Sequence, residues 1–280
     1  MKWIQTVADL RDALPTRGAG TVGFVPTMGA LHAGHVRLFE VARRECDVVV
    51  ASIFVNPTQF NDATDLAAYP RVEAQDGELA MAAGVDILFL PSVGEVYPDG
   101  HATTVVAEGA ALGFEGDHRP GHFNGVATVC LKLFSMVRPD RAYFGQKDAQ
   151  QVAVIRQMVA DLNLALDIRV VATERDADGL ALSSRNARLS PAERIQALAI
   201  SRALRAGLDA HHAGRDPVAA ARAELAGLDV EYVAVAPFQG APTLVIAARV
   251  GTTRLIDNVP LHDPQAAGLR FQRDVPTGSP

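Results

Sequence analysis

The chain has 280 residues, 49% hydrophobic and 21% charged, which is enough apolar material for one large globular domain or two smaller ones. Its net charge of -6 and pI near 5.7 argue against a nucleic-acid duplex as the main partner, because binding many phosphates needs a basic face. The absence of any apolar run of about 18 residues predicts that no segment spans a membrane.

Short apolar runs alternate with helical periodicity through the first part of the chain. The runs predict strands, the first broken by Pro26, at residues 21–27, 47–57, 85–91, 141–145 and 166–173. Apolar residues three and four apart predict helices at residues 34–46, 73–83, 124–137 and 148–162, and Asn124 is expected to cap the third of these. This alternation is typical of βαβ units with a parallel sheet.

The pattern changes after about Thr173. Residues 174–190 read as a polar loop, and a long helix is expected from Pro191, with Ser190 as its N-cap. Strands joined by hairpins are predicted at residues 228–237, 241–250 and 252–258. The sequence therefore predicts an α/β protein with a Rossmann-like, doubly wound parallel sheet over residues 1–173 and a smaller C-terminal α+β lid domain over residues 174–280.

Three polar segments directly follow predicted strands: "VPTMGALHAGH" ends at His35, "FVNPTQF" starts at Phe54 and "FGQKDAQQ" starts at Phe144. Ligands of doubly wound sheets bind outside the carboxyl ends of the strands. We therefore expect these three segments to share one edge of the sheet and to form the binding site.

His32 and His35 stand in the expected turn from the first strand into its helix, beside Gly29 and Gly34. Backbone N–H groups at a helix N-terminus attract anions, and imidazoles there can donate hydrogen bonds to phosphate oxygens. Such donors favour phosphoryl or nucleotidyl transfer because the charge on the oxygens rises in the transition state. Two solvated loop histidines are the plain alternative. A zinc pair is disfavoured, since no third ligand is spaced nearby.

"HAGH" resembles the HIGH motif of adenylate-forming nucleotidyltransferases, and "LALSSRN" (residues 180–186) takes the place of their downstream KMSKS-type loop. The resemblance narrows to the pantothenate synthetase (pantoate–β-alanine ligase) family. Matching segments run in register across the chain: "VPTMGALHAGH", "SIFVNPTQF", "YPR", "RPGHFNGVATV", "AYFGQKDAQQ", "DGLALSSRN" and "ARVGTTRLIDN".

This resemblance implies an ATP-dependent ligase that forms an amide bond between (R)-pantoate and β-alanine. The reaction passes through pantoyl adenylate and releases AMP and pyrophosphate. The resemblance also implies Mg²⁺ alongside ATP and a homodimer formed through the first domain. Cys46 and Cys130 lie in apolar patterns, which predicts buried thiols in a reducing, cytoplasmic setting.

The resemblance also assigns site residues by position. The catalytic group would be His35, usually the proton donor, together with His32, Lys147 and Arg185. The expected ATP-binding residues are Met28, Gly29, Ala30, Leu31, His32, Ala33, Gly34, His35, Gly145, Gln146, Lys147, Asp148, Glu174, Leu182, Ser183, Ser184 and Arg185. The residues expected to bind pantoate and β-alanine are Asn56, Gln59, Tyr69 and Gln151.

The chain departs from the family pattern at several positions. Ala33 replaces a common Glu, Glu174 stands where an apolar residue usually borders the adenine, and Ala149 replaces a common Tyr. Asp76 matches an acidic position that the family associates with magnesium, but Gln75 stands before it where the family often has a second acidic residue. Arg119 and His122 in "RPGHF" match a family segment without an evident role.

Two other kinds of protein remain as alternatives. One is a related nucleotidyltransferase that moves AMP onto a phosphate ester, which would not need the glutamines expected to hold pantoate. The other is a catalytically silent nucleotide-binding module, which would have little reason to keep His32, His35, Lys147 and Arg185 together.

Overall fold

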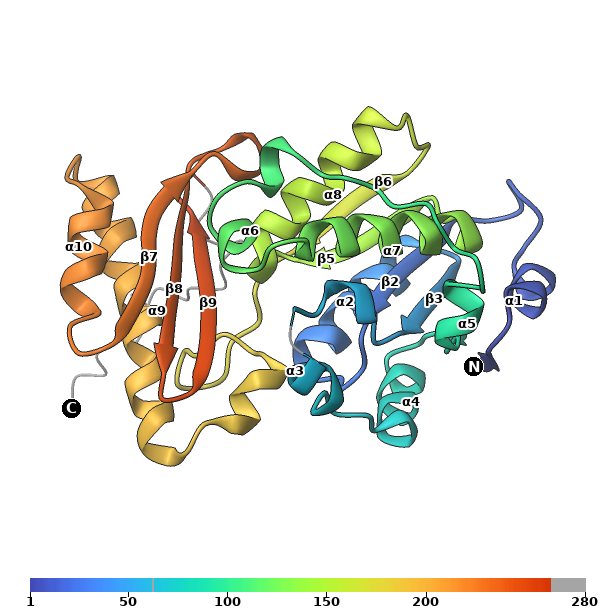
Figure 1. The fold of residues 1–280 in the computed structure, drawn as a ribbon, viewed down its shortest axis with the longest axis horizontal. Helices are drawn as coiled ribbons and strands as arrows, with labels where there is room; N and C mark the ends of the chain where they lie inside the picture. The colour runs from blue at the N-terminus through green and yellow to red at the C-terminus, as the bar shows by residue number, and fades with distance from the viewer. Residues whose placement is uncertain (62, 263–280) are drawn as a thin grey trace, which may run out of the picture. The chain divides into compact units, whose positions relative to one another are not determined.

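The computed structural model describes residues 1–61 and 63–262, and the chain divides into two compact units. The first unit is Met1–Val171 and the second starts at Ala172, so this division falls two residues before the boundary expected from the sequence. The first unit holds a six-stranded parallel sheet and the second a three-stranded antiparallel sheet, which confirms the predicted fold class (Figure 1).

The parallel sheet has the strand order β1-β4-β3-β2-β5-β6. Its members are β1 (Lys2–Ile4), β2 (Val22–Thr27), β3 (Val48–Ile53), β4 (Ile87–Phe89), β5 (Arg141–Gly145) and β6 (Asp167–Val171). From β2 the chain winds outward through β3 to β4, and then it returns to the other side of β2 to add β5 and β6. The topological switch point therefore lies between β2 and β5, where such sheets bind their ligands.

Pro26 does not break β2, contrary to the prediction. The strand continues to Thr27 and stays paired with β3, where Pro26 faces Ser52. Its pairing with β5 is confined to Gly23 and Phe24. Proline has no N–H to donate to a sheet ladder, so it is tolerated in this central strand beyond the last pair with β5.

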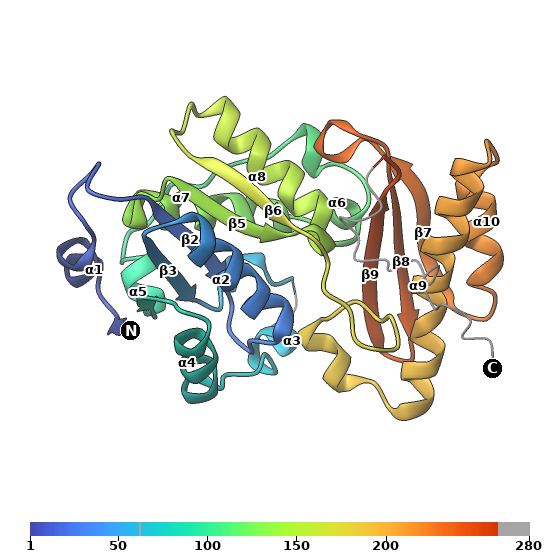
Figure 2. The same cartoon turned by 180° about the vertical axis from the view of Figure 1, so that it is seen from behind.

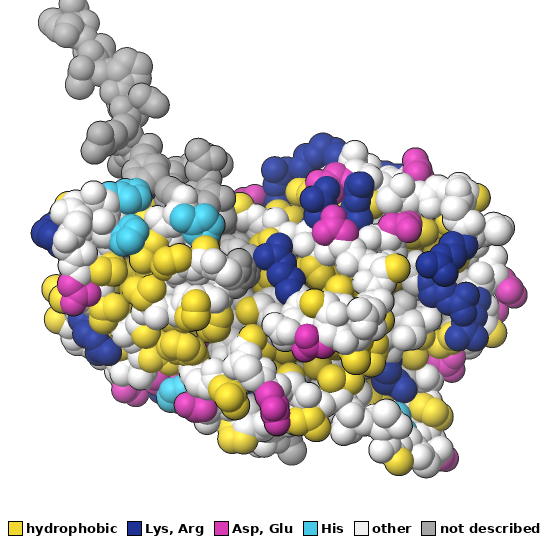
Figure 3. Space-filling model, turned by 90° about the horizontal axis from the view of Figure 1, so that it is seen from above, with side chains coloured by type: hydrophobic (Ala, Val, Ile, Leu, Met, Phe, Trp, Pro, Cys, Tyr) yellow, Lys and Arg dark blue, Asp and Glu magenta, His cyan; other side chains and the backbone are white. Residues whose placement is uncertain are grey.

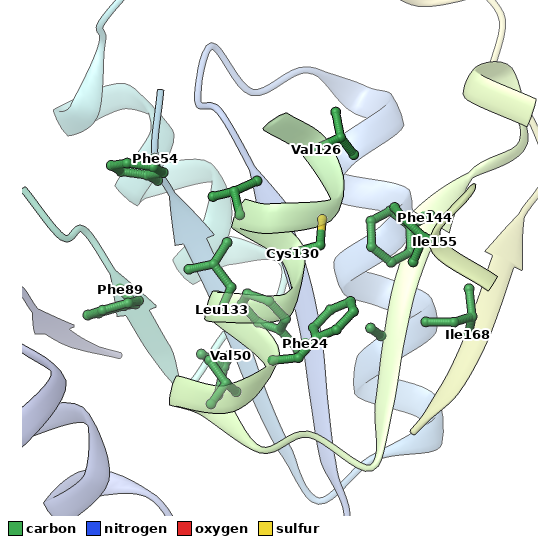
Figure 4. Close-up of a cluster of buried hydrophobic side chains, with 14 of the residues drawn as sticks. Phe24, Val50, Phe54, Phe89, Val126, Cys130, Leu133, Phe144, Ile155 and Ile168 are labelled. Atoms are coloured by element: carbon green, nitrogen blue, oxygen red, sulfur yellow. The ribbon is translucent and has the colours of Figure 1, made fainter. Parts of the chain in front are cut away.

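Helices cover both faces of the parallel sheet (Figures 1 and 2). On one face, α7 (His122–Val137) and α8 (Ala149–Asp161) pack on alternate residues of the strands; Figure 4 shows Phe24, Val50 and Phe144 around Cys130 of α7. On the other face, α2 (Ala33–Glu45) and α4 (Glu73–Ala82) cover the intervening residues, including Val25, Ala51 and Leu88. A strand buried on both faces reads as a continuous apolar run, which explains why β3 was predictable.

Several short elements of the first unit were not predicted. They are β1 (Lys2–Ile4), α1 (Val7–Ala13), α3 (Ala63–Ala67), α5 (Val93–Val96), α6 (Glu115–His118) and the 3₁₀ turns η1 (Pro57–Gln59), η2 (Gly109–Ala111) and η3 (Gln146–Asp148). The prediction that Asn124 caps α7 is wrong. The N-cap is Gly121, with a left-handed φ of 78°, and the Asn124 side chain instead accepts a hydrogen bond from the Ala107 N–H at 2.9 Å.

The second unit packs its helices on one antiparallel sheet. The strands are β7 (Asp229–Ala236), β8 (Thr243–Val250) and β9 (Thr253–Pro260), and the other elements are α9 (Pro191–His212), α10 (Pro217–Glu224), η4 (Ser184–Arg188) and η5 (Phe238–Gly240). The predicted start of α9 is confirmed: Ser190 and Glu193 form a reciprocal capping box, and Pro191 occupies the first turn. Buried residues of α9, such as Ile200 and Leu204, share a core with Leu244 and Ile246 of β8.

The surface gives no sign of a broad basic patch on the face drawn in Figure 3. Basic side chains there form small groups, several of them beside acidic ones. Within residues 1–61 and 63–262, no helix combines the length and the apolar character needed to cross a bilayer.

Candidate active site

Three loops leave the carboxyl ends of neighbouring strands at the switch point. They follow β2 at Met28, β3 at Phe54 and β5 at Gln146. All six strands run in parallel, with β2 between β3 and β5, so these three ends meet at one edge of the sheet. The expectation that the three segments share this edge is confirmed.

The first of these loops, residues 28–32 between β2 and α2, has an unusual backbone. Gly29 and Ala30 have positive φ values of 81° and 52°. A Cβ on Gly29 would lie 2.9 Å from Asp76 Oδ2, so the close approach of that carboxylate requires glycine. Gly29 N–H donates to Thr27 Oγ1 at 3.2 Å, which ties the start of the loop back to β2.

Asp76 of α4 fixes the other end of this β2–α2 loop. Its Oδ2 accepts from Ala30 N–H at 2.9 Å and its Oδ1 accepts from Leu31 N–H at 2.7 Å. The residue is only 1% exposed, so both hydrogen bonds are shielded from water. A buried carboxylate that receives two N–H groups is a strong brace for a backbone that would otherwise be strained.

His32 and His35 hold the first turn of α2. The His32 ring accepts at Nδ1 from Gly34 N–H at 3.1 Å, and His35 Nδ1 accepts from His32 N–H at 3.3 Å. Each neutral ring therefore carries its proton on Nε2. The rings pack together with centroids 4.1 Å apart. The two histidines are helix caps, and their Nε2–H groups are hydrogen-bond donors.

The third loop brings a positive charge to the same place. The pKa of the His35 imidazole is lowered from 6.5 to about 3, first by burial and then by electrostatic interaction with His32 and with Lys147, which lies in η3 after β5. His35 is therefore neutral at physiological pH. The site combines neutral imidazole donors with one lysine, and its ammonium is 3.7 Å from Asp148 Oδ1.

The second loop places two of the expected pantoate residues in contact. Asn56 and Gln59 are buried, with exposed fractions of 1% and 8%, and Asn56 Nδ2 donates to Gln59 Oε1 at 3.0 Å. Asn56 Oδ1 accepts from Thr58 Oγ1 at 2.9 Å and from the Tyr97 hydroxyl at 2.9 Å, which fixes the orientation of its amide. Gln59 Nε2 thus points to the β2–α2 loop, where it lies 3.2 Å from Met28 Sδ.

The remaining expected residues of the first unit lie at or near the same edge. Gly145 ends β5, Gln146 is buried in η3, and Gln151 is half-buried in the first turn of α8. Tyr69 is buried and packs edge-on against Phe60, with ring centroids 5.7 Å apart. Ala33 and Gly34 open α2, and Ala33 is exposed, so the lost glutamate leaves the caps of this helix intact.

Asp76 is a poor fit to the magnesium role that the resemblance suggests. Both of its oxygens already accept backbone hydrogen bonds, and neighbouring Gln75 supplies no carboxylate. Among the residues that the structure describes, no group of three or more acidic, histidine or cysteine side chains could hold a metal ion. The described side chains around Asp76 therefore do not fit a magnesium site built from protein ligands alone.

The second unit carries the serine–arginine loop, Leu182–Arg185, at the end of a tight turn. Leu182 N–H donates to Glu174 O at 2.9 Å, so Glu174 contributes backbone to this turn. Ser183 caps η4 by accepting from Arg185 N–H at 3.3 Å. Ser184 and Arg185 are partly exposed at the start of η4.

A buried ion pair supports this turn and was missed from the sequence. Arg175 and Asp257 pair through two contacts of 2.7 and 3.1 Å, with side-chain exposures of only 6% and 3%. Arg175 also donates to Gly179 O at 3.2 Å within the turn. Asp257 lies in "TTRLIDN", a segment that matched the family but received no role from the sequence. Its partner Arg175 is 82 residues away, so the sequence did not reveal the pair.

This geometry defines a class of protein. A doubly wound parallel sheet carries at its switch point a helix N-terminus, two imidazole donors and a lysine, which together form an anion site suited to the phosphates of a nucleotide. The fold and site are those of a nucleotide-binding α/β enzyme.

The chain belongs to the pantoate–β-alanine ligase family, whose model it matches over residues 2–260. It is 50% identical to the pantothenate synthetase of Cereibacter sphaeroides over 275 residues, covering 92% of this chain and 99% of that protein. The pantothenate synthetase of Moorella thermoacetica is 48% identical over 280 residues, covering 93% and 99%.

Solved structures give the same result. Pantothenate synthetase from Thermus thermophilus superposes with a TM-score of 0.87 at 46% identity, covering 93% of this chain and 99% of that one. Pantoate–β-alanine ligase from Francisella tularensis, solved as a complex with βγ-ATP and β-alanine, gives 0.81 at 36% identity over 94% and 98%. The resemblance read from the motifs, and with it the expected ligase class, is confirmed.

Proposed function

We propose that this chain joins pantoate to β-alanine at the expense of ATP, releasing AMP and pyrophosphate through a pantoyl adenylate. The observation that carries the proposal is the family match across residues 2–260, together with an anion site at the β2–β5 switch point. The ATP and β-alanine named for the Francisella tularensis ligase are the substrates proposed here.

In the first half-reaction the pantoate carboxylate attacks the α-phosphorus of ATP, and pyrophosphate leaves. Two anions must be brought together, so positioning and neutralisation of charge do most of the work. The Nε2–H groups of His32 and His35, at the N-terminus of α2, and the ammonium of Lys147, in η3, are proposed to neutralise this charge. Because His35 has its pKa lowered to about 3, we propose that it acts as a neutral hydrogen-bond donor and that its family role as proton donor does not require an imidazolium.

Pantoate is assigned to the neighbouring loop. Its hydroxyls and carboxylate need donors and acceptors, which amides supply. Asn56 occupies Gln59 Oε1, so Gln59 offers Nε2–H to a substrate oxygen. Gln151 and Tyr69 are proposed to complete this pocket, and Gly145, Gln146 and Asp148 to hold the ribose.

In the second half-reaction the β-alanine amine attacks the carbonyl of the adenylate, and AMP leaves. The adenylate is already activated, so no protein base is required. Ser183, Ser184 and Arg185 are proposed to contact the nucleotide from the second unit, with Glu174 and Leu182 bordering the adenine through their backbone. Their approach would exclude water that could hydrolyse the anhydride.

Magnesium is proposed to arrive with ATP, as part of the metal–nucleotide substrate. Mg²⁺ keeps several waters and binds substrate phosphates more readily than it fills a cage of protein ligands. A homodimer and a cytoplasmic location are proposed on the family resemblance, and the two buried free cysteines agree with a reducing compartment.

An omission assay tests the function. Purified protein is supplied with ATP, magnesium, pantoate and β-alanine, and pantothenate is measured with each component left out in turn. We expect pantoate-dependent exchange of pyrophosphate into ATP without β-alanine, and AMP release only when β-alanine is added. AMP transfer to a phosphate ester, or nucleotide binding with no turnover, would support the two alternatives instead.

A further inference from the structure

The segment Arg119–His122 matched the family but has no part in the proposed mechanism. It forms the turn between α6 and α7: Arg119 ends α6, Gly121 takes the left-handed φ of 78° that reverses the chain, and His122 begins α7. His122 is only 6% exposed. A buried, polar ring in this place needs partners, and it finds them in the loop after β3.

The three groups form a closed hydrogen-bonded triangle. His122 Nδ1 lies 3.0 Å from Gln59 O, Arg119 Nη1 lies 3.1 Å from His122 Nε2, and Arg119 Nη2 donates to Gln59 O at 3.3 Å. A carbonyl can only accept, so Nδ1 must carry the proton of the ring. Nε2 then accepts from the guanidinium, and the imidazole is held as one neutral tautomer.

The other end of Gln59 is fixed as well. Its Oε1 accepts from Asn56, and the same Asn56 amide donates to Gly125 O of α7 at 3.2 Å. Gly125 lets the helix and the loop approach closely, since a Cβ there would lie 2.5 Å from Thr58 O. The first two turns of α7 therefore support η1, and Arg119 and His122 hydrogen-bond to the carbonyl of Gln59, the last residue of η1.

We propose that Arg119 and His122 are positioning residues for the hydroxy-acid substrate: they hold the Gln59 backbone so that its side-chain Nε2–H faces the substrate oxygen. This inference rests on the proposed function, because it assumes that Gln59 binds pantoate. It assigns the two residues no contact with ATP and none with the reacting atoms. Their loss should therefore weaken pantoate binding selectively.

Replacement of His122 by two amides separates positioning from packing. The Nδ2 of asparagine takes the place of the ring Nδ1, so His122→Asn keeps the donor to Gln59 O; glutamine places its amide near Nε2, so His122→Gln loses that donor. We expect His122→Gln to raise the KM for pantoate about tenfold, the scale of one hydrogen bond. The KM for ATP and the melting temperature should change little, and His122→Asn should stay close to wild type.

Arg119 provides the second arm of the test, because it is half-buried and its loss threatens folding less than that of His122. Arg119→Met should raise the pantoate KM in the same selective way, and Arg119→Lys should recover part of the loss. The matched control is His118→Gln, because His118 is an exposed histidine of the adjoining α6. This variant should leave both KM values unchanged.

The measurements are pantoate-dependent pyrophosphate exchange at varied pantoate and at varied ATP, with thermal melting of each variant. Equal rises in both KM values, equal effects of His122→Asn and His122→Gln, or a lower melting temperature with unchanged KM would each overturn the proposal. A wild-type protein with no pantoate-dependent exchange would instead refute the proposed function, before any variant is compared.

Discussion

The β2–α2 loop of the first unit and the serine–arginine loop of the second both rest on a buried aspartate, but the two carboxylates have different partners. Asp76 accepts from the backbone N–H groups of Ala30 and Leu31. Asp257 pairs with the guanidinium of Arg175, which in turn donates to the carbonyl of Gly179. In the first loop the carboxylate holds the backbone directly, and in the second it acts through an arginine.

This difference bears on how a buried acidic residue near a nucleotide motif should be interpreted. Proximity to a predicted ATP site suggests a metal ligand, yet both of these carboxylates are occupied by the protein itself. The side chains at the two loops also differ: imidazoles stand at the end of the first, and the guanidinium of Arg185 stands at the second. Each difference can be tested by substitutions in one loop at a time.

The largest effect is expected from breaking the ion pair in the second unit. Arg175→Met leaves Asp257 buried and unpaired, which should lower the free energy of unfolding by about 3–5 kcal/mol. The double change Arg175→Met with Asp257→Leu removes both charges and should recover most of this loss. Urea denaturation followed by circular dichroism measures both. Arg202→Gln, which breaks the exposed 3.6 Å contact to Glu224, is the control and should cost about 1 kcal/mol or less.

A single-variant loss no larger than that of Arg202→Gln would show that the pair does not support the turn. If the turn also sets the place of the serine–arginine loop, the double variant will be stable but will have a raised KM for ATP. That outcome would show that the Arg175–Asp257 pair is needed to position the serine–arginine loop even where it is not needed for stability.

The second largest effect is expected from removing a neutral donor at the N-terminus of α2. His35→Ala should cost about 2.7–4 kcal/mol of transition-state stabilisation, as for the loss of one preorganised donor. His35→Gln places an amide N–H near the position of Nε2 and should recover part of this loss without any group that titrates. Pantoate-dependent pyrophosphate exchange gives the rates. Near-normal adenylate formation by His35→Ala would contradict the role proposed for this ring.

Asp76→Asn tests the direct brace. The amide can accept only one of the two N–H groups and turns its own NH₂ toward the other, so the free energy of unfolding should fall by about 1.5–3 kcal/mol. Trp3, the only tryptophan of the chain, packs against Gly77 of α4 and reports unfolding of the first unit by fluorescence. Glu73→Gln, exposed in the first turn of the same helix, is the control.

Asp76→Asn also distinguishes a brace from a metal ligand. A brace predicts a higher KM for ATP with the same magnesium concentration for half-maximal exchange at saturating ATP. A ligand predicts that the magnesium requirement itself rises several-fold, and this result would restore the role suggested by the family resemblance.

Local patterns made most of the fold predictable, and long-range contacts account for what was missed. The apolar run of β3 and the Ser190–Pro191 start of α9 depend on neighbouring residues, so both were recognised. Pro26 was misread because its tolerance depends on where β5 stops pairing, and Asn124 because Gly121 reverses the chain just ahead of it.

In the site, too, local motifs could be recognised and long-range contacts could not. His32, His35 and Lys147 could be found because each belongs to a short motif directly after a strand. Asp76 lies 45 and 46 residues from the N–H groups that it holds, and Arg175 lies 82 residues from Asp257. No spacing in one sequence reveals such pairs, so neither the backbone contacts of Asp76 nor the ion pair was predicted.

The smallest expected effect concerns pH. Burial lowers the pKa of His35 to about 3 and that of His122, helped by the charge of Arg119, to about 4. The unfolded chain takes up a proton at each ring below about pH 6.5, whereas the folded chain does not until much lower pH. Stability contributed by these neutral rings is therefore complete above about pH 6.5 and is lost as the pH falls, by roughly 1 kcal/mol per ring at about pH 6.

Urea denaturation monitored by Trp3 at pH values between about 7.5 and 6, on either side of the ordinary histidine pKa, measures this slope. His122→Asn cannot titrate, so its stability should fall less steeply than that of the wild type over the same interval. Parallel curves for wild type and His122→Asn would mean that folding does not lower the pKa of His122, which would contradict the burial of a neutral ring between Gln59 O and Arg119.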